Sequence, residues 1–307
     1  MKLKRIKFPK ESIKLNRIFP INNNSLNKSA HEYIEEIYGD FDIPSIDKLP
    51  YLYGSLIMTL DGKIGFEDQT KSNEISKGNF LDPNGGLADL WVLNLLRTYS
   101  DGIIFGSKTL EVETNITGHI YDEKLEDIRM KSLNKDKRIP WNIIISRSGK
   151  MNLNHKIMKE EDIPTIILTT KEGCKYISQR IENQVEEIEI NNDKDKLKNN
   201  KKIKVLYEEH TNEFNIYNML KKLKEAGLHK ILVESPGFIS VLLKEKLLNE
   251  MFINYSGLYS GGNLILNKNP YSKNDYPGID IISIHIHQNN FLYMRQKLIY
   301  KNKKKYS

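Results

Sequence analysis

The sequence predicts an α/β fold with a mainly parallel central sheet, flanking helices and an antiparallel hairpin near the C-terminus. Three observations support this prediction. Short runs rich in Ile and Val recur between residues 51 and 257, each bounded by turn residues. Helical patterns separate several of these runs, as the crossovers between parallel strands require. Towards the C-terminus, apolar and polar residues alternate on both sides of Asn289-Asn290, which indicates two antiparallel strands.

The main domain begins with the strand-like run YLYGSLIMTL, which is closed by the turn dipeptide Asp61-Gly62. Apolar residues then recur at helical spacing over 87–99. Further helices are predicted at 216–227, which ends in a glycine suited to a helix terminus, and at 238–250. The other strand-like runs lie at 101–107, 141–149, 164–170, 202–209, 229–237 and 251–257, and the predicted hairpin lies at 279–300.

The first fifty residues carry weaker patterning. A short helix is predicted at 31–38, where Ser29 and Glu32 would form a capping box. Residues 40–50 contain two prolines and are interpreted as a connector. Three segments are therefore expected: an N-terminal appendage and connector at 1–50, the main domain at 51–299 and a basic tail at 300–307.

The composition is typical of a globular protein with a sizeable core. Of 307 residues, 39% are hydrophobic and 28% are charged, with both signs represented. No run approaches the ~20 apolar residues that span a bilayer, and the basic N-terminus lacks the apolar run of a signal peptide. The single cysteine, Cys174, excludes a disulfide within the chain and a multi-cysteine zinc site. A cytoplasmic protein without membrane contact is expected.

The net charge of +7 is compatible with an anionic small molecule as partner. Nucleic acid is disfavoured, because 39 lysines accompany only 8 arginines, whereas specific phosphate and base recognition favours the arginine fork. The lysine runs at 194–204 and 301–305 are interpreted as a solvated loop and a frayed tail. The polar segment 191–202 is expected to be a mobile loop.

Ligands of open α/β sheets bind outside the carboxyl ends of the strands, and three such ends carry candidate residues. In DGIIFGSKT, Gly106 permits close approach of a ligand, and the amides from Ser107 to Thr109 suit a phosphate. An ordinary turn with Thr109 as helix cap is the alternative. In WNIIISRSGK, Arg147 and Lys150 suit a phosphate, or are simply exposed turn cations.

The third strand end is HKILVESPG, where a strand runs into a helix that opens at Pro236 or Gly237. Glu234 stands at the end of this apolar strand. A carboxylate in such a place is costly unless it meets a donor, a cation or a substrate, so Glu234 is a candidate functional residue.

Other catalytic motifs are absent from the sequence. It contains no G-x-G-x-x-G after the first strand, no Walker motif and no G-x-S-x-G. Cys174 lies at a predicted helix start without an evident histidine partner, and a structural role is favoured. His285 and His287 share one face of a predicted strand, but a pair lacks a third ligand, so a surface strand is favoured over a metal site. No metal is expected.

Taken in order, five segments resemble motifs of the reductase domain of bacterial riboflavin biosynthesis, a pyrimidine reductase of the dihydrofolate-reductase-like fold. They are SLIMTLDGKIG, the Ser72, Ile75 and Ser76 stretch, LLRTYSDGIIFGSKTLEVE, IIISRSGKMNL and HKILVESPGFISVLLKEKLLNEMFI. The resemblance covers residues 51–299. It implies an NADPH-dependent 5-amino-6-(5-phosphoribosylamino)uracil reductase-like enzyme, with hydride passing to C1′ of the opened sugar. A homodimer is also expected from the family.

The resemblance further implies roles for individual residues. Ser72, Arg97 and Glu234 would lie on the substrate side, with Glu234 as the catalytic residue. Arg147 would lie near the adenosine ribose and its 2′-phosphate. The residues expected to face the cofactor are Gly106, Ser107, Thr109, Arg147, Pro236, Gly237, Phe238, Ile239 and Ser240. Hydride transfer needs two reacting centres held face to face and charges that orient the substrate, and these residue types suit that task.

The sequence also departs from the family pattern. Glu234 is followed by Ser-Pro-Gly in place of Gly-Gly, which removes one backbone donor at Pro236. The substrate-phosphate arginine expected after EVETNIT is absent, and His119 is the nearest candidate. A single cysteine cannot build the zinc site of the partner deaminase domain, so only the reductase is expected.

Several alternatives follow from these departures. The substrate is the riboflavin precursor or, in a divergent paralogue, another heterocycle. A nucleotide-binding protein of the same fold that has lost turnover is a second alternative. A nucleic-acid-binding protein that uses the lysine runs ranks third, because no aromatic residues interleave with those runs.

Overall fold

The computed structural model describes residues 3–20, 30–69, 71, 73–181, 184–189, 203–208, 214–267 and 270–301. The helices of this part of the chain are α1 (Lys10–Ile13), α2 (Glu32–Ile37), α3 (Asn73–Lys77), α4 (Gly85–Tyr99), α5 (Ser107–Val112), α6 (Glu123–Lys131), α7 (Lys156–Lys159), α8 (Lys171–Ser178), α9 (Ile216–Glu225) and α10 (Pro236–Lys244). The strands are β1 (Asn16–Phe19), β2 (Tyr51–Thr59), β3 (Gly102–Gly106), β4 (Trp141–Ile145), β5 (Thr165–Leu168), β6 (Val185–Glu189), β7 (Ile203–Tyr207), β8 (Lys230–Val233), β9 (Glu250–Ser256), β10 (Pro277–His287) and β11 (Phe291–Tyr300).

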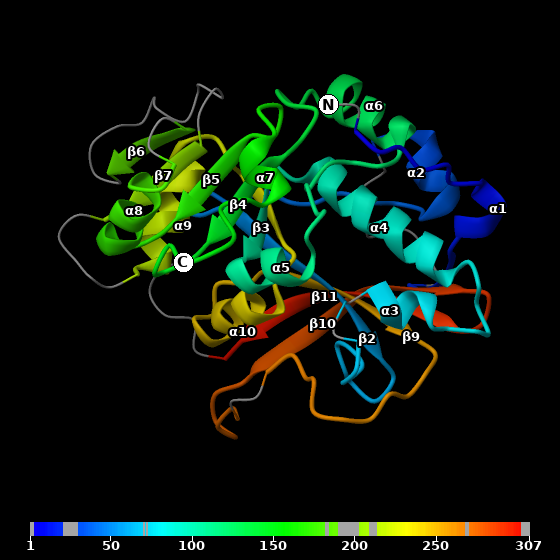
Figure 1. Ribbon diagram of the computed structural model, residues 1–307. Coiled ribbons are helices and arrows are strands. Elements are labelled where there is room, and N and C mark those ends of the chain that lie inside the picture. The colour runs from blue at the N-terminus through cyan, green and yellow to red at the C-terminus, as the bar shows by residue number, and fades with distance from the viewer. Residues whose placement is uncertain are drawn as a thin grey trace.

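These strands form one sheet in the order β1-β10-β11-β9-β2-β8-β3-β4-β5-β7-β6 (Figure 1). The pairs from β9 through β2 to β6 are parallel, and those from β9 to β1 are antiparallel. The predicted fold class is confirmed, including the hairpin of β10 and β11, whose turn residues Gln288 and Asn289 have positive φ. The central strands are buried on both faces, which explains their continuous apolar runs.

Helices cover both faces of the sheet. One apolar cluster joins α9 and α10 to one face through residues such as Leu223 and Leu242. The other cluster joins α4, α6 and α2 to the opposite face through residues such as Trp91, Leu125 and Ile34, and these helices gather together in Figure 1. Neighbouring residues of a strand therefore point to different helical layers.

Residues that precede the main domain contribute to this architecture. β1 pairs with β10 and so extends the sheet, while Ile13, Ile34 and Phe41 are buried in the same cluster as α4. Arg295 of β11 binds Glu250 of β9 through hydrogen bonds of 2.8 and 3.2 Å, and it also donates to the carbonyl oxygen of Asp42. The described residues among the first fifty thus share a core with the domain that follows them.

Three local expectations are wrong. The helix that was predicted at 238–250 ends at Lys244, because Lys246 adopts a φ of 61° and turns the chain into β9. The cap of α2 is His31, whose Nδ1 accepts the amide of Tyr33, and Ser29 lies outside the described residues. Lys204, which was expected in a solvated loop, is fully buried in β7 and pairs with Glu186.

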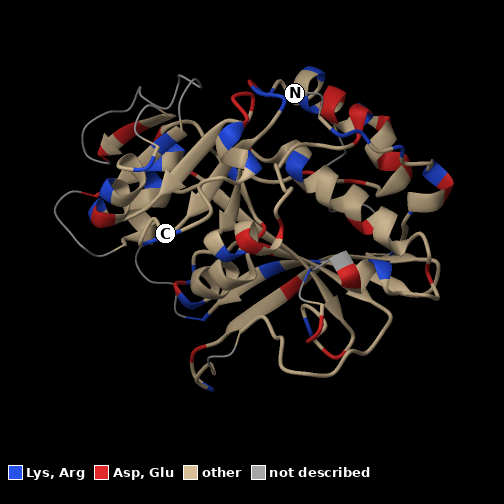
Figure 2. Cartoon of the chain, viewed as in Figure 1, with Lys and Arg blue, Asp and Glu red and all other residues tan. Residues whose placement is uncertain are grey.

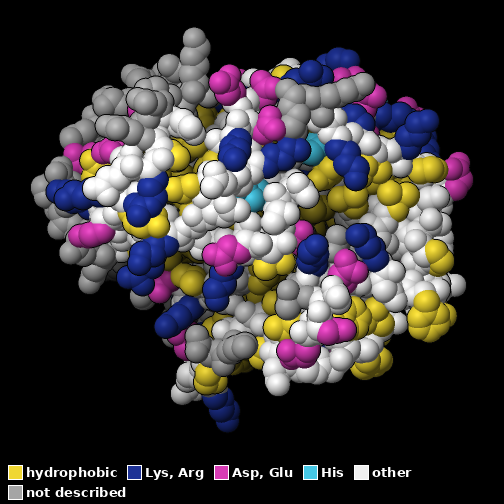
Figure 3. Space-filling view, viewed as in Figure 1, with side chains coloured by type: hydrophobic (Ala, Val, Ile, Leu, Met, Phe, Trp, Pro, Cys, Tyr) yellow, Lys and Arg dark blue, Asp and Glu magenta, His cyan; other side chains and the backbone are white. Residues whose placement is uncertain are grey.

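Charged residues are distributed over the described chain with both signs mixed (Figure 2). The face seen in Figure 3 likewise shows basic side chains interspersed with acidic and apolar ones. Within the described ranges, no helix is both long enough and apolar enough to cross a membrane. Residues 191–202, predicted to be a mobile loop, lie outside the part that the structure describes.

Candidate functional site

A buried ion pair lies at the carboxyl end of β8. Arg97, from the last turn of α4, donates from Nε and Nη2 to the two carboxylate oxygens of Glu234, with both distances 2.7 Å. The two side chains are only 2% and 8% exposed, and Nη1 of Arg97 donates to the carbonyl oxygen of His119 at 3.0 Å. Burial alone would lower the pKa of Arg97, but the Glu234 carboxylate outweighs it and raises that pKa. The guanidinium therefore stays charged.

Arg129 binds the C-terminal end of α4. Its buried guanidinium approaches the carbonyl oxygens of Thr98 and Ser100 at 2.9 and 2.5 Å, and its Nε donates to Lys137. These carbonyls belong to the last turn of the helix, which has no intrahelical donors for them. Burial lowers the pKa of Arg129 to about 10, so it remains a cation at neutral pH and suits the negative end of the helix.

The two residues that follow β8 point to opposite faces of the sheet. Glu234 points to the α4 layer, whereas the next residue, Ser235, points to the α10 layer and caps that helix by accepting the amide of Phe238. Ser235 also lies against Gly106 at the end of β3, where an added Cβ would come 2.7 Å from the Ser235 hydroxyl oxygen. The absence of a side chain at Gly106 lets the ends of β3 and β8 approach closely.

The first turn of α10 has open space outside it. A Cβ added at Gly237 would meet no atom within 4 Å. Pro236 occupies the first helical position, as predicted. The side chains of Phe238 and Ile239 are buried in the core, and the Ser240 hydroxyl lies 2.5 Å from the carbonyl oxygen of Leu266. Phe238 and Ile239 could therefore meet a ligand here only through their backbone, whereas the side chain of Ser240 is partly exposed.

The neighbouring strand ends carry further predicted residues. Ser107 and Thr109 begin α5 and are partly exposed, and Gly106 takes the cap position that was considered for Thr109. Gly106 pairs with Ile145 of β4, which places the exposed side chain of Arg147 just beyond the adjacent strand end. The ends of β8, β3 and β4 thus bring most of the predicted site residues to one edge of the sheet.

Two partly exposed residues on the α4 side were not predicted. Ser55 lies in β2 and is partly exposed, although the neighbouring strand residues are buried. Asp89 lies about two turns before Arg97 on α4 and accepts a hydrogen bond of 2.7 Å from Asn254. Burial raises the pKa of Asp89 to about 6. The signal in the sequence was a carboxylate inside the apolar helix LADLWVLNLL.

His119 does not have the properties of a phosphate-binding residue. Its Nε2 lies 3.0 Å from the carbonyl oxygen of Lys4, and its Nδ1 contacts the hydroxyl of Thr117. Burial lowers the pKa of His119 to about 4, so the ring is neutral at physiological pH. Ser72, the other residue expected on the substrate side, lies outside the described residues.

The remaining candidates are buried. Cys174 lies within α8, and burial raises the pKa of its thiol to about 12, which leaves it unreactive. His285 and His287 were expected on a surface strand. This is wrong, because residues that include Ser12, Tyr38 and Asp82 cover them. His287 contacts Asp82 at 2.6 Å, and His285 contacts the carbonyl oxygen of Tyr38 at 2.9 Å. The described residues contain no group of three or more His, Cys, Asp or Glu arranged to hold a metal ion.

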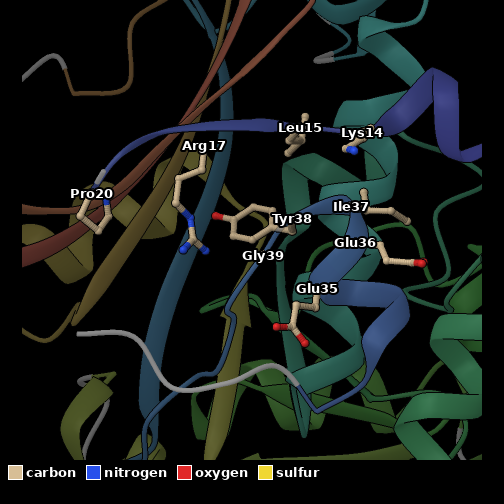
Figure 4. Close-up of a pocket in the computed structure, with 9 residues that line it drawn as sticks. All are labelled: Lys14, Leu15, Arg17, Pro20, Glu35, Glu36, Ile37, Tyr38 and Gly39. Atoms are coloured by element: carbon tan, nitrogen blue, oxygen red, sulfur yellow. The ribbon is translucent and has the colours of Figure 1, made fainter. Parts of the chain in front are cut away.

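A recess of about 490 Å³ lies elsewhere, between α2 and the segment that contains β1 (Figure 4). Its lining residues include Lys14, Arg17 and Glu36, with Arg17 directed towards Tyr38 and Gly39. Arg17 binds Asp40, so this cation already has a carboxylate partner. None of the residues that line the recess belongs to the edge that carries Arg97 and Glu234.

Comparison with known proteins agrees with this architecture. The chain is 26% identical over 229 residues to the riboflavin biosynthesis protein RibD of Aquifex aeolicus, which corresponds to 73% of this chain and 51% of that protein. The chain therefore spans about half the length of the curated relative that it matches.

Solved structures share the fold. A pyrimidine reductase-like protein from Corynebacterium diphtheriae aligns with a TM-score of 0.61 and 15% identity, over 86% of this chain and 98% of that one. Acinetobacter baumannii RibD aligns with a TM-score of 0.54 and 16% identity, over 82% of this chain and 59% of that one. At these identities the structural likeness establishes the dihydrofolate-reductase-like fold alone.

The family model that describes the RibD C-terminal domain matches residues 50–268. This range contains β2, β8, β3 and β4 and both residues of the buried ion pair. The chain belongs to the RibD C-terminal domain family, and the resemblance that the motifs indicated is confirmed.

Proposed function

We propose that this protein is an NADPH-dependent reductase of a ribosylamino-pyrimidine phosphate, the riboflavin-pathway reaction named for a Thermotoga maritima relative as that of a 5-amino-6-(5-phosphoribosylamino)uracil reductase. The observation that carries the proposal is the buried pair of Arg97 and Glu234, placed beside the open turn of α10. A neutral apolar pair would cost less to bury, so a charged pair at a strand end favours a role in ligand binding.

The proposed cofactor site is the α10 side of this edge. Its residues fit a dinucleotide, because Gly237 leaves room outside the helix start and the partly exposed Gly106 lets the ends of β3 and β8 lie close together there. Arg147, exposed beyond β4, would read the 2′-phosphate that distinguishes NADPH from NADH. When bound, the nicotinamide supplies the hydride, and the protein supplies orientation.

The proposed substrate site is the α4 side. Arg97 and Glu234 would hold the polar groups of the substrate through charge-assisted hydrogen bonds, with Glu234 as the catalytic residue that touches it. Ser72 is proposed as a further substrate ligand from the family resemblance. The same resemblance supports a homodimer that acts on a small-molecule substrate. The composition of the chain supports a cytoplasmic protein without nucleic acid or membrane partners.

The test begins with a fluorescence titration of the purified protein with NADPH, with NADH alongside. Micromolar binding with a preference for NADPH is expected. NADPH oxidation in the presence of 5-amino-6-(5-phosphoribosylamino)uracil, followed by absorbance, then tests the substrate. Failure to bind either nucleotide would overturn the reductase assignment, whereas NADPH binding without oxidation would overturn the substrate alone.

A further inference from the structure

A segment near the N-terminus lies against the chain that supports Arg97. The carbonyl oxygen of Lys4 lies 3.0 Å from Nε2 of His119, and the amide of Ile6 donates to the carbonyl oxygen of Tyr121 at 3.1 Å. Residues 4–6 thus run beside residues 119–121. We call residues 119–121 the support strip. Figure 1 shows this N-terminal segment passing α6 towards α1.

Arg5 fastens the segment in place. Its Nη1 donates to the carbonyl oxygen of Ile120 at 3.0 Å, and its Nη2 lies 2.8 Å from both carboxylate oxygens of Glu126. Glu126 is on α6 and is 2% exposed, while the Arg5 side chain is 34% exposed. Because one partner is buried, this ion pair is screened less than a pair on the open surface.

The other side of the support strip faces α4. The carbonyl oxygen of His119 accepts Nη1 of Arg97, and the amide of Tyr121 donates to Asn94 at 2.5 Å. The strip is therefore held between the N-terminal segment and the helix that carries Arg97. A shift of His119 would remove one of the three hydrogen bonds that orient the guanidinium.

We propose that residues 4–6 position Arg97 for substrate through the support strip, with Arg5 as the principal positioning residue. This inference rests on the proposed function, because it gives Arg97 the role of a substrate ligand. Residues 4–6 lie outside the range 50–268 that the family model matches. The cofactor side of the edge has no part in these contacts and is not expected to change.

The test compares three variants of the full-length protein. Arg5→Ala removes the contacts to Ile120 and Glu126. Arg5→Lys retains a cation that can reach Glu126. Lys10→Ala is the matched control, because it removes one positive charge from the neighbouring helix α1. It breaks an exposed ion pair with Glu36 that does not contact the support strip. The measurements are KM for 5-amino-6-(5-phosphoribosylamino)uracil, Kd for NADPH, melting temperature and hydrogen exchange.

Arg5→Ala is expected to raise KM about tenfold, because a small misplacement of an orienting group is costly. Its Kd for NADPH should stay within about twofold, and hydrogen exchange should accelerate in the peptide spanning 117–122. Arg5→Lys should recover much of the loss, and Lys10→Ala should match the wild type. Equal changes in KM and in the Kd for NADPH would indicate general destabilisation and overturn the inference.

Hydrogen exchange separates this inference from the proposed function. If the wild-type protein does not turn over the pyrimidine, the substrate assignment fails. Suppose that hydrogen exchange at 117–122 and at the end of α4 is faster in Arg5→Ala but not in Lys10→Ala. That result would still support the positioning role of residues 4–6. Unchanged exchange in those peptides would overturn it, whatever the activity.

Discussion

Arg97 and Glu234 are separated by 137 positions in the sequence, yet two hydrogen bonds of 2.7 Å join them at the edge of the sheet. The pair forms because β8 inserts between β2 and β3, which places its carboxyl end beneath the last turn of α4. Each side chain neutralises the charge of the other, so neither charge is buried without a partner.

Glu234→Gln should lower kcat/KM for the pyrimidine by at least about a hundredfold, because it removes a charge that orients the substrate. The Kd for NADPH should change less than about threefold, since Glu234 points to the α4 layer. Arg97→Ala should likewise lower kcat/KM much more than it weakens NADPH binding. It should also lower the free energy of unfolding by about 3–5 kcal/mol, because the Glu234 carboxylate is left without its partner. Steady-state kinetics beside nucleotide titration measure both quantities. An equal loss of NADPH affinity in both variants would count against the assignment.

Gly237→Ala tests where the cofactor lies. The added Cβ has free space in this structure, and alanine favours a helix over glycine by about 0.5–1 kcal/mol, so the melting temperature should hold or rise. If the phosphates of NADPH occupy the space outside α10, the Kd should rise about tenfold or more. Unchanged NADPH affinity in a folded variant would move the cofactor away from this turn.

Arg147→Ala should narrow the preference for NADPH over NADH, because the 2′-phosphate would lose its guanidinium partner. A five- to thirtyfold fall in the ratio of the two dissociation constants is expected, equivalent to about 1–2 kcal/mol. Lys159→Ala is the control, since it removes an exposed cation from α7 and leaves the turn that carries Arg147 unchanged. A ratio unaffected by Arg147→Ala, or lowered equally by the control, would contradict the assignment.

Asp89→Asn should stabilise the protein above about pH 6. The pKa of Asp89 is raised from 3.8 to about 6, so the folded state binds more protons than the unfolded state between those values. Its contribution to stability therefore falls as pH rises through this window. The variant keeps an oxygen for Asn254 and should gain about 1–2 kcal/mol at pH 8 but little at pH 4. Denaturant unfolding at both pH values gives the comparison, and an equal effect at the two would contradict the prediction.

Acid should destabilise the protein below about pH 6.5. Burial lowers the pKa of His119 to about 4 and that of His285 to about 3. Between these values and 6.5, the unfolded state therefore binds more protons than the folded state. The stability from both groups is complete above pH 6.5 and is lost as pH falls towards 3, by up to about 1.4 kcal/mol per pH unit and proton. His119→Asn should make this decline shallower between pH 6.5 and 4. The same slope in variant and wild type would exclude His119 as a contributor.

The order and type of most elements follow from local patterns in the sequence. The apolar runs that became β2, β3, β4 and β8 are buried on both faces, so each carries its own signal without reference to distant residues. Helix termini with special residues, such as Pro236 in α10, were predicted for the same local reason. Glu234 could be singled out because a carboxylate that ends an apolar strand has a cost that is evident in the sequence.

Contacts between distant segments required the tertiary structure. His285 and His287 alternate like residues of an exposed strand, but contacts with Ser12, Tyr38 and Asp82 bury them. His119 was considered for a phosphate because its type and position allowed it, but burial leaves it neutral. Asp89 depends in the same way on Asn254 of β9, which packing alone brings beside α4.

The sequence by itself determined the fold class, the edge of the sheet where ligands are expected and the residue types available there, because these depend on periodicity and on turn chemistry. The tertiary structure decided which of those residues meet. The bond between Arg97 and Glu234, the open space at Gly237 and the contact of residues 4–6 with the support strip depend on strand order and on segments far apart in the chain. No local pattern records such proximity, because it arises only when the whole core assembles.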